Sequence, residues 1–196
     1  MRDVIAIETE RLRLRTWEPD DLAQFIRLTN TPTGMRYLGG VAGPEIYQGL
    51  YERILLSQQQ NGFCFWIAER REDRAMLGIC GFKRGTVDPI IDAMEIGWRF
   101  REDVWGQGYA REAAAACLDW GWRNVPDDRI VAITVIGNTS SWGLMERLGM
   151  RRNLALDFDH PNHAVGDPFR PHITYEIARR GAGGEIARPL PTENGR

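Results

Sequence analysis

The sequence predicts one domain of mixed α/β class, with a mostly antiparallel sheet, one parallel pair of strands and about four flanking helices. Three observations lead to this class. The 196 residues suit one domain of ordinary size, and strand-like and helix-like patterns alternate along them. A lone helix between two strands implies a crossover, which joins parallel strands. We place the domain at residues 1–180 and expect the polar, Gly-rich tail at 181–196 to be disordered.

The amino-terminal third predicts a strand followed by two helices. Between Ile5 and Trp17 two leucines alternate with arginines, which is typical of a half-buried strand. A helix follows the proline and acids of Glu18–Asp21, with Leu22, Phe25 and Ile26 on its buried face. Residues 31–43 contain Gly and Pro and predict an irregular connection. Pro44 begins a second helix, whose apolar positions include Ile46, and Asn61–Gly62 ends it.

The rest of the chain alternates between the two kinds of element. Three strand patterns come first, then a helix, a strand, a second helix and two final strands. In chain order they are expected at Phe63–Glu69, Met76–Phe82, Ala93–Arg101, Arg111–Asn124, Ile130–Ile136, Ser141–Leu148, Arg151–Phe158 and Ile173–Ala178.

Composition excludes several classes of function. The net charge is −2 and no Lys/Arg cluster is longer than a pair, which argues against nucleic-acid binding. No apolar run approaches the roughly 20 residues that span a bilayer, and the acidic start does not resemble a secretion signal. We therefore expect a cytoplasmic protein. Cys64, Cys80 and Cys117 are isolated and predict reduced core thiols without a metal or redox motif.

The stretch VWGQGYAREA, residues 104–113, places two glycines directly before a helix. A P-loop is excluded because Lys83 is the only lysine, and the dinucleotide fingerprint lacks both its third glycine and its acid. Two interpretations stay open. One is a tight turn without a ligand. The other is a cradle in which the N–H groups from Gly106 to Arg111 converge on a pyrophosphate at the helix N-terminus.

Several ordered segments resemble the GNAT N-acetyltransferases, and most of all their Rim-type branch, which includes enzymes that acetylate the N-termini of ribosomal proteins. The resemblance rests on IGWRFREDVWGQGYAREA and VIGNTSSWGLMERLGMRR and extends over residues 7–180. Gly108 and Ala110 match the last two fixed positions of the family's Q/R-x-x-G-x-G/A pattern, whereas Trp105 stands where Gln or Arg is usual.

The resemblance implies direct transfer of an acetyl group from acetyl-CoA to a primary amine, without a metal. It implies that the strand at Met94–Phe100 splays from its parallel neighbour, that the pantetheine arm fills the gap, and that an N–H near Phe100 polarises the thioester carbonyl. The residues expected to contact acetyl-CoA are Trp98, Arg99, Phe100, Arg101, Trp105, Gly106, Gln107, Gly108, Tyr109, Ala110, Arg111, Asn138 and Ser141.

Two side chains are candidates for catalysis. Glu95 is a carboxylate on an otherwise apolar strand, which suits a general base acting directly or through water. Its alternative is a salt bridge to an arginine such as Arg99. Ser141 is expected, from the resemblance, to protonate the departing thiolate, while Asn138 braces the cofactor. The alternative for Ser141 is that it caps the following helix.

The loop at 157–171 is expected to frame the acceptor groove together with residues 31–43. Its Asp157, Asp159, His160 and His163 match no trusted zinc spacing, and His172 is either structural or assists the amine. The acceptor is left open between a protein N-terminus and a small-molecule amine, as is a homodimer. Two other functions remain as alternatives: a non-catalytic acyl-CoA sensor and a nucleotide-binding regulatory module.

Overall fold

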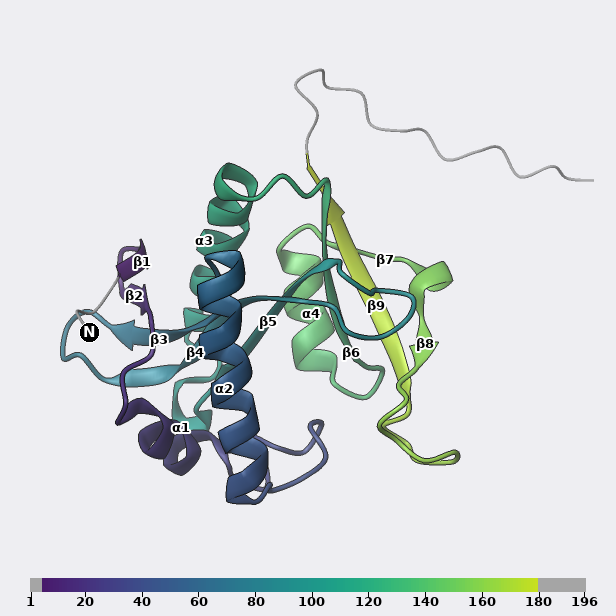
Figure 1. Ribbon diagram of the computed structural model, residues 1–196, viewed down its shortest axis with the longest axis horizontal. Helices are drawn as coiled ribbons and strands as arrows, with labels where there is room; N and C mark the ends of the chain where they lie inside the picture. Colours follow the sequence, from purple (N-terminus) through teal and green to yellow (C-terminus); the bar gives the residue numbers. More distant parts are fainter. Residues whose placement is uncertain (1–4, 180–196) are drawn as a thin grey trace, which may run out of the picture.

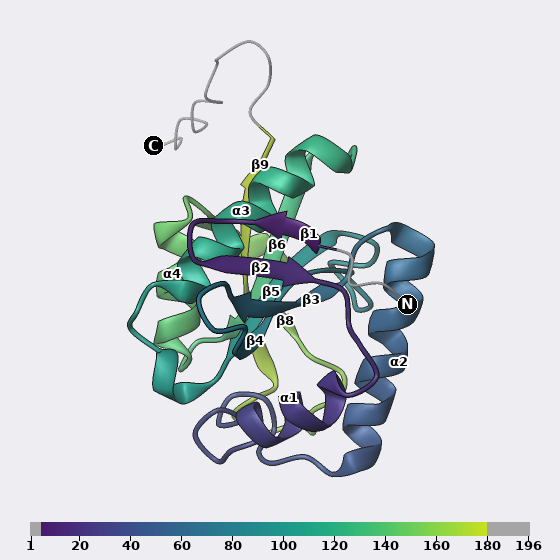
Figure 2. The same ribbon diagram turned by 90° about the vertical axis from the view of Figure 1, so that its left-hand side faces the viewer.

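One open sheet runs through the molecule, with helices on both of its faces (Figures 1 and 2). The computed structural model describes residues 5–179, and its strand order is β1-β2-β3-β4-β5-β6-β9-β7, with β8 also paired to β9. The strands are β1 (Ile5–Glu8), β2 (Leu12–Arg15), β3 (Phe65–Arg70), β4 (Met76–Arg84), β5 (Met94–Phe100), β6 (Arg129–Val135), β7 (Arg151–Arg152), β8 (Phe158–Asp159) and β9 (Pro171–Ala178). The helices are α1 (Asp21–Thr29), α2 (Pro44–Asn61), α3 (Tyr109–Asn124) and α4 (Thr139–Arg147).

The predicted fold class is confirmed, including its single parallel pair. All adjacent strands are antiparallel except β5 and β6, which α3 connects. The parallel ladder contains only two pairs, Met94 with Ile130 and Glu95 with Val131. Both strands continue beyond these pairs without further pairing to each other. The sheet therefore opens into a gap towards the carboxyl ends of β5 and β6.

The helices divide between the two faces. Gly121 of α3 packs closely on the sheet, because a Cβ there would lie 3.3 Å from Met94 of β5 and from Ile130 of β6. On the opposite face, Phe25 of α1 packs against the guanidinium of Arg99 on β5. Residues alternate between the faces along a strand. The even-numbered residues of β5, such as Met94, therefore face α3, and the odd-numbered ones, such as Arg99, face α1 and α2.

Three predicted elements differ in detail from the structure. The run from Ile5 to Trp17 is a hairpin of two strands, because the chain turns where the Thr9 amide donates to the Leu12 carbonyl at 2.9 Å. The run at 151–158 is two short strands separated by a 3₁₀ turn, since the Asn153 side chain accepts from the Ala155 amide. Ile46, expected on the buried face of α2, is 59% exposed.

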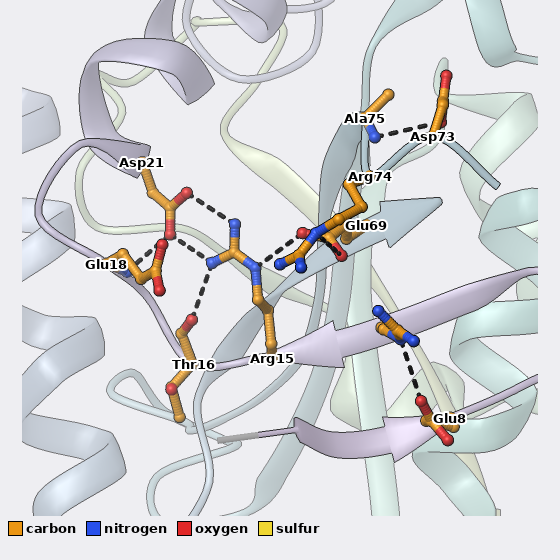
Figure 3. Close-up of polar contacts among 10 residues, drawn as sticks. Glu8, Arg15, Thr16, Glu18, Asp21, Glu69, Asp73, Arg74 and Ala75 are labelled. Atoms are coloured by element: carbon orange, nitrogen blue, oxygen red, sulfur yellow. Dashed lines mark hydrogen bonds and ion pairs between the residues drawn. The ribbon is translucent and has the colours of Figure 1, made fainter. Parts of the chain in front are cut away.

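A buried ion network joins β2, β3 and the start of α1 (Figure 3). Arg15 donates to both oxygens of Asp21 at 2.6 and 2.9 Å, and its Nε lies 3.2 Å from Glu69 Oε2. All three side chains are buried. The alternation in β2 predicts one face of leucines and one of arginines, and the leucine face is buried as expected. Arg15 is buried as well, because α1 covers the arginine face at this end of the strand.

No helix within residues 5–179 is long and apolar enough to cross a membrane. The predicted disordered tail, 181–196, lies outside the described residues.

Candidate active site

The gap between β5 and β6 presents main-chain groups from both strands. The Arg101 amide donates to the Leu77 carbonyl of β4 at 2.8 Å. Because successive residues of a strand direct their N–H groups to opposite edges, those of Trp98 and Phe100 point into the gap. The main chain of Arg99 faces β4, where it is paired with Ile79. An extended ligand lying in the gap would therefore meet the unpaired amides of Trp98 and Phe100.

Trp105 closes the end of this row of groups. Its indole N–H donates to the Phe100 carbonyl at 2.8 Å, and the ring is 49% exposed. By the same alternation this carbonyl faces the gap. Trp105, the residue that departs from the family pattern, therefore covers the last carbonyl of β5 that faces the gap with a partly exposed ring.

The glycine turn leads from the gap into α3 and leaves its donors unused. Gly106 and Gly108 have φ angles of 75° and 84°, a left-handed conformation that favours glycine. Within residues 5–179 none of the six N–H groups from Gly106 to Arg111 donates a hydrogen bond to the protein. They lie at the amino terminus of a 16-residue helix, whose dipole favours an anion. This donor set suits the diphosphate of a CoA molecule.

The turn is held from behind by the β1–β2 hairpin. Arg11 donates from Nη1 to the Gln107 carbonyl at 3.1 Å, and its guanidinium lies 4.3 Å from the centre of the Tyr109 ring. Glu112, in the first turn of α3, accepts from the Arg11 amide, the Arg11 side chain and Thr9. Burial alone would raise the pKa of Glu112, but these hydrogen bonds lower it below its ordinary value. The cradle is thus preorganised by residues that do not face it.

Glu95 lies where the two parallel strands part, and its partner is a lysine. It is 6% exposed, and Lys83 Nζ, on the neighbouring strand β4, lies 3.0 Å from its Oε2. The alternative of an ion pair with Arg99 is wrong, because Lys83 is directly opposite Glu95 across the β4–β5 ladder. Burial raises the pKa of Glu95, and the Lys83 charge offsets part of that rise. Within the described residues Oε2 receives no well-directed hydrogen bond.

Asn138 and Ser141 lie at the start of α4, just beyond the end of β6. Asn138 is the N-cap residue, but its side chain donates to Thr134 Oγ1 at 3.0 Å and does not cap the helix. The helix begins at Thr139, so the alternative in which Ser141 caps it is wrong. The Ser141 hydroxyl makes no hydrogen bond to residues 5–179, although its backbone amide donates to the Asn138 carbonyl. The hydroxyl is thereby free to serve a ligand.

The three histidines of the chain form one cluster at the far side of the gap. The His160 ring centre lies 4.9 Å from that of His172 and 5.5 Å from that of His163. His172 is paired with Val135 at the end of β6, and Phe158 stacks on it. Burial lowers the pKa of both His160 and His172, so both are neutral near pH 7. For His160 the neighbouring histidines and Lys83 lower it further.

Lys83, Glu95 and His172 project from the same face of the sheet. Cross-strand partners project from the same face, and Lys83 pairs with Glu95, Glu95 with Val131 of β6, and β6 with β9. His172, whose partner Val135 has the same parity as Val131, therefore lies on the face of Glu95. This is also the face of Arg99 and of helices α1 and α2, and we call it the α1–α2 face. Among the described residues no group of three His, Cys, Asp or Glu is arranged to hold a metal ion.

The remaining predicted contacts lie at the edges of the site. Arg101 forms an ion pair with Asp103 at 2.6 Å, and Arg111 is exposed on the first turn of α3. Sequence reasoning missed the Lys83 partner and the surroundings of the Arg99 side chain. The sequence does carry a signal for Arg99, because Arg99 and Glu95 are four residues apart and project from the same face of an otherwise apolar strand.

Comparison with known proteins agrees with this geometry. Residues 11–151 match the family model described as an acetyltransferase (GNAT) domain. YkkB of Bacillus subtilis (strain 168) is 34% identical over 143 residues, which cover 72% of this chain and 83% of the relative. The N-acetyltransferase p20 of Bacillus licheniformis is 28% identical, over 82% of this chain and 91% of its own length.

Solved structures share the fold. RimL, a ribosomal L7/L12 α-N-protein acetyltransferase whose structure is in complex with coenzyme A, aligns with a TM-score of 0.70 and 17% identity. That alignment covers 89% of this chain and 98% of RimL.

Proposed function

The chain belongs to the GNAT acetyltransferase family and is an N-acetyltransferase, and from this premise we propose that it transfers an acetyl group from acetyl-CoA directly to a primary amine. The observation that carries the proposal is the continuity of the site. The open gap between β5 and β6 runs into six successive backbone N–H groups that have no acceptor among the described residues. We further propose that residues 1–180 form one acetyltransferase domain.

We place the enzyme in the Rim-type branch, with a protein N-terminus or a small-molecule amine as the acceptor. The likeness to RimL supports the fold of that branch. The predicted Glu95, Asn138 and Ser141 all lie around the same gap, which supports an active enzyme over a non-catalytic sensor. Such a sensor would bind acetyl-CoA without releasing thiol when amines are added.

In binding, acetyl-CoA supplies an acetyl thioester, and the residues of this chain position it. The N–H groups from Gly106 to Arg111 donate hydrogen bonds to the diphosphate. The amides of Trp98 and Phe100 that face the gap donate to the pantetheine arm and to the thioester carbonyl. Asn138, fixed by its bond to Thr134, braces the arm from the β6 side. The acceptor approaches from the α1–α2 face, where Glu95 lies.

In the reaction, Glu95 removes a proton from the acceptor ammonium, directly or through water. The neutral amine attacks the thioester carbon, a C–N bond forms, and a strand amide of β5 stabilises the oxyanion by hydrogen bonding. When the C–S bond breaks, the Ser141 hydroxyl gives its proton to the thiolate, and the second proton that the nitrogen loses returns to Ser141 directly or through water. The products are the amide, the free thiol and a neutral serine. The raised pKa of Glu95 suits a base that works near neutral pH.

Ser141→Ala is expected to lower kcat by roughly 10- to 100-fold, because thiolate protonation would fall to water. The melting temperature is expected to stay the same, since the hydroxyl makes no hydrogen bond within residues 5–179. Steady-state thiol release and a thermal melt measure both effects. Ser140→Ala, at an exposed neighbouring position, is the control and should leave both unchanged. Unchanged kcat in the Ser141 variant would remove the acid role.

Gly108→Ala tests the cradle. A Cβ at φ 84° strains the turn by about 1 kcal/mol and displaces N–H groups, so the Kd for acetyl-CoA is expected to rise about tenfold. Calorimetric titration with acetyl-CoA, CoA, ATP and NAD measures it. Gly62→Ala carries a similar strain at φ 74°, at the end of α2, and should leave the Kd unchanged. If the wild type bound ATP or NAD more tightly than CoA, the protein would instead be a nucleotide-binding module.

A further inference from the structure

Arg99 carries a charge that the protein does not neutralise. Its guanidinium lies 5.4 Å from the centre of the Phe25 ring and 5.9 Å from that of Tyr47, and Nη1 donates to the Tyr47 hydroxyl at 3.3 Å. Within residues 5–179 it forms no ion pair with a carboxylate. Of its five N–H donors, four have no acceptor there. Partial burial lowers the pKa of Arg99, while the side chain keeps part of its surface in contact with solvent.

The fully buried charges within residues 5–179 are all paired. Arg15 holds two carboxylates, and Glu95 lies against Lys83. A buried charge is normally paired because removing it from water is unfavourable. Arg99 differs from them, because it is only half-buried and water still reaches it beside its two aromatic rings. A ligand that covered Arg99 would displace this water, so a ligand that supplied an anion would be favoured there.

The side chain of Arg99 projects from the face on which we propose that the acceptor approaches. Its main chain is paired with β4, and its side chain projects from the α1–α2 face. The phosphate cradle lies at the start of α3, beyond the carboxyl end of β5. Glu95 lies on the same face, four residues earlier on the strand. Between them Gly97 has no side chain, and the Phe65 ring packs over the position that a Cβ would occupy.

Tyr47 holds the guanidinium from the buried side. Its hydroxyl accepts from Arg99 and donates to the Met35 sulfur at 3.5 Å. Tyr47 is only 1% exposed, so it fixes the guanidinium and leaves the other donors of Arg99 for a ligand. The planar fork of these donors matches a carboxylate or a phosphate.

We propose that Arg99, held in place by Tyr47, binds an anionic group of the acceptor, so that the substrate is an amine that also carries a carboxylate or a phosphate. The inference rests on the proposed function, since it assigns the amine of that substrate to Glu95 and its anion to Arg99. Arg99 thereby determines specificity and takes no part in proton transfer.

The test compares matched amines that differ in their charge. β-Alanine with β-alaninamide and 4-aminobutyrate with its amide probe a carboxylate, and O-phosphoethanolamine with ethanolamine probes a phosphate. Values of kcat/KM are expressed per neutral amine, because the anion changes the pKa of the amine. The wild type is expected to favour the anionic member of at least one series by tenfold or more. The series that shows the preference identifies the anion.

In Arg99→Met the ratio of kcat/KM for the anionic amine to that for its neutral partner is expected to fall to within twofold of one. Arg99→Lys is expected to retain part of the preference. The ratio is the readout because a general loss of activity cancels in it. Arg13→Met, which removes an arginine from β2, three strands away from β5, should leave the ratio unchanged. Should Arg99→Met not fold, calorimetric titration of the CoA-loaded wild type and of Arg99→Lys with acetate and with inorganic phosphate replaces it. Weaker binding to the lysine variant supports the proposal.

Two outcomes overturn the assignment of Arg99. One is a wild type that uses both members of every pair equally and binds neither anion. The other is an anion preference that Arg99→Met retains. Failure of the proposed function looks different, because the protein would then not bind acetyl-CoA or CoA at all. CoA binding together with acetylation of neutral amines, and without an anion preference, would end only the inference on Arg99.

Discussion

Glu95→Gln is expected to lower kcat/KM by roughly 10²- to 10⁴-fold, the usual contribution of a positioned general base. Glutamine keeps the shape of the side chain and its hydrogen-bonding capacity but cannot accept the ammonium proton. Because burial raises the pKa of Glu95, the wild-type activity should fall, on acidification, at a pH above the ordinary range of a glutamate. The variant should lose this acid limb. Steady-state thiol release across pH 5–9 measures both effects.

The stability of the same variant provides the control. A carboxyl group with a raised folded-state pKa contributes stability that is present below its unfolded pKa and is lost as the pH rises through the folded value. Above that pH the ionised Glu95 lowers the stability of the folded protein, so Glu95→Gln should melt at a temperature no lower than that of the wild type at neutral pH. Lys83→Met keeps the base but removes its counter-charge, and should move the acid limb to higher pH. Full activity in Glu95→Gln at every pH would exclude Glu95 as the base.

Arg15→Ala is expected to reduce the free energy of unfolding by about 3–5 kcal/mol, since it leaves the buried Asp21 without its partner and Glu69 with only the exposed Arg74. Asp21 and Glu69 would both lose the guanidinium that now lies 2.6 and 3.2 Å away. The start of α1 would lose its main anchor to the sheet. Urea unfolding at neutral pH measures the change, read from the transition midpoint at constant m-value.

Arg13→Ala is the matched control for this substitution. Arg13 lies two residues earlier on the same strand and pairs with Glu8, but both side chains are partly exposed. A surface pair of this kind contributes little, so the change should stay within about 0.5 kcal/mol. Equal losses in the two variants would show that burial of the network around Arg15 does not matter for stability.

Much of the fold follows from local patterns. The glycine that ends α2 and the proline that begins it were predictable because they act through their own backbone angles. The parallel pair was predictable from a single crossover helix. The break at 153–156 was not, because an Asn side chain there competes with the strand for backbone hydrogen bonds.

The site was predictable where it depends on the main chain and less so where it depends on pairing between strands. The N–H groups of the glycine turn belong to one continuous segment, so their spacing is visible in the sequence. The Lys83–Glu95 pair instead depends on the register between β4 and β5, which no local pattern fixes. Arg15 was placed on the correct face of its strand, but its burial depends on a helix that packs there later in the chain.

The two-pair seam between β5 and β6 also makes the sheet incomplete as a folding unit. Strands β1–β5 and β6–β9 are held to one another by two residue pairs and by the helices that cross the seam. If acetyl-CoA fills this gap as proposed, it joins the two halves of the sheet in the folded chain, so its concentration would raise the free energy of unfolding. The availability of the co-substrate would then set how long the native state persists.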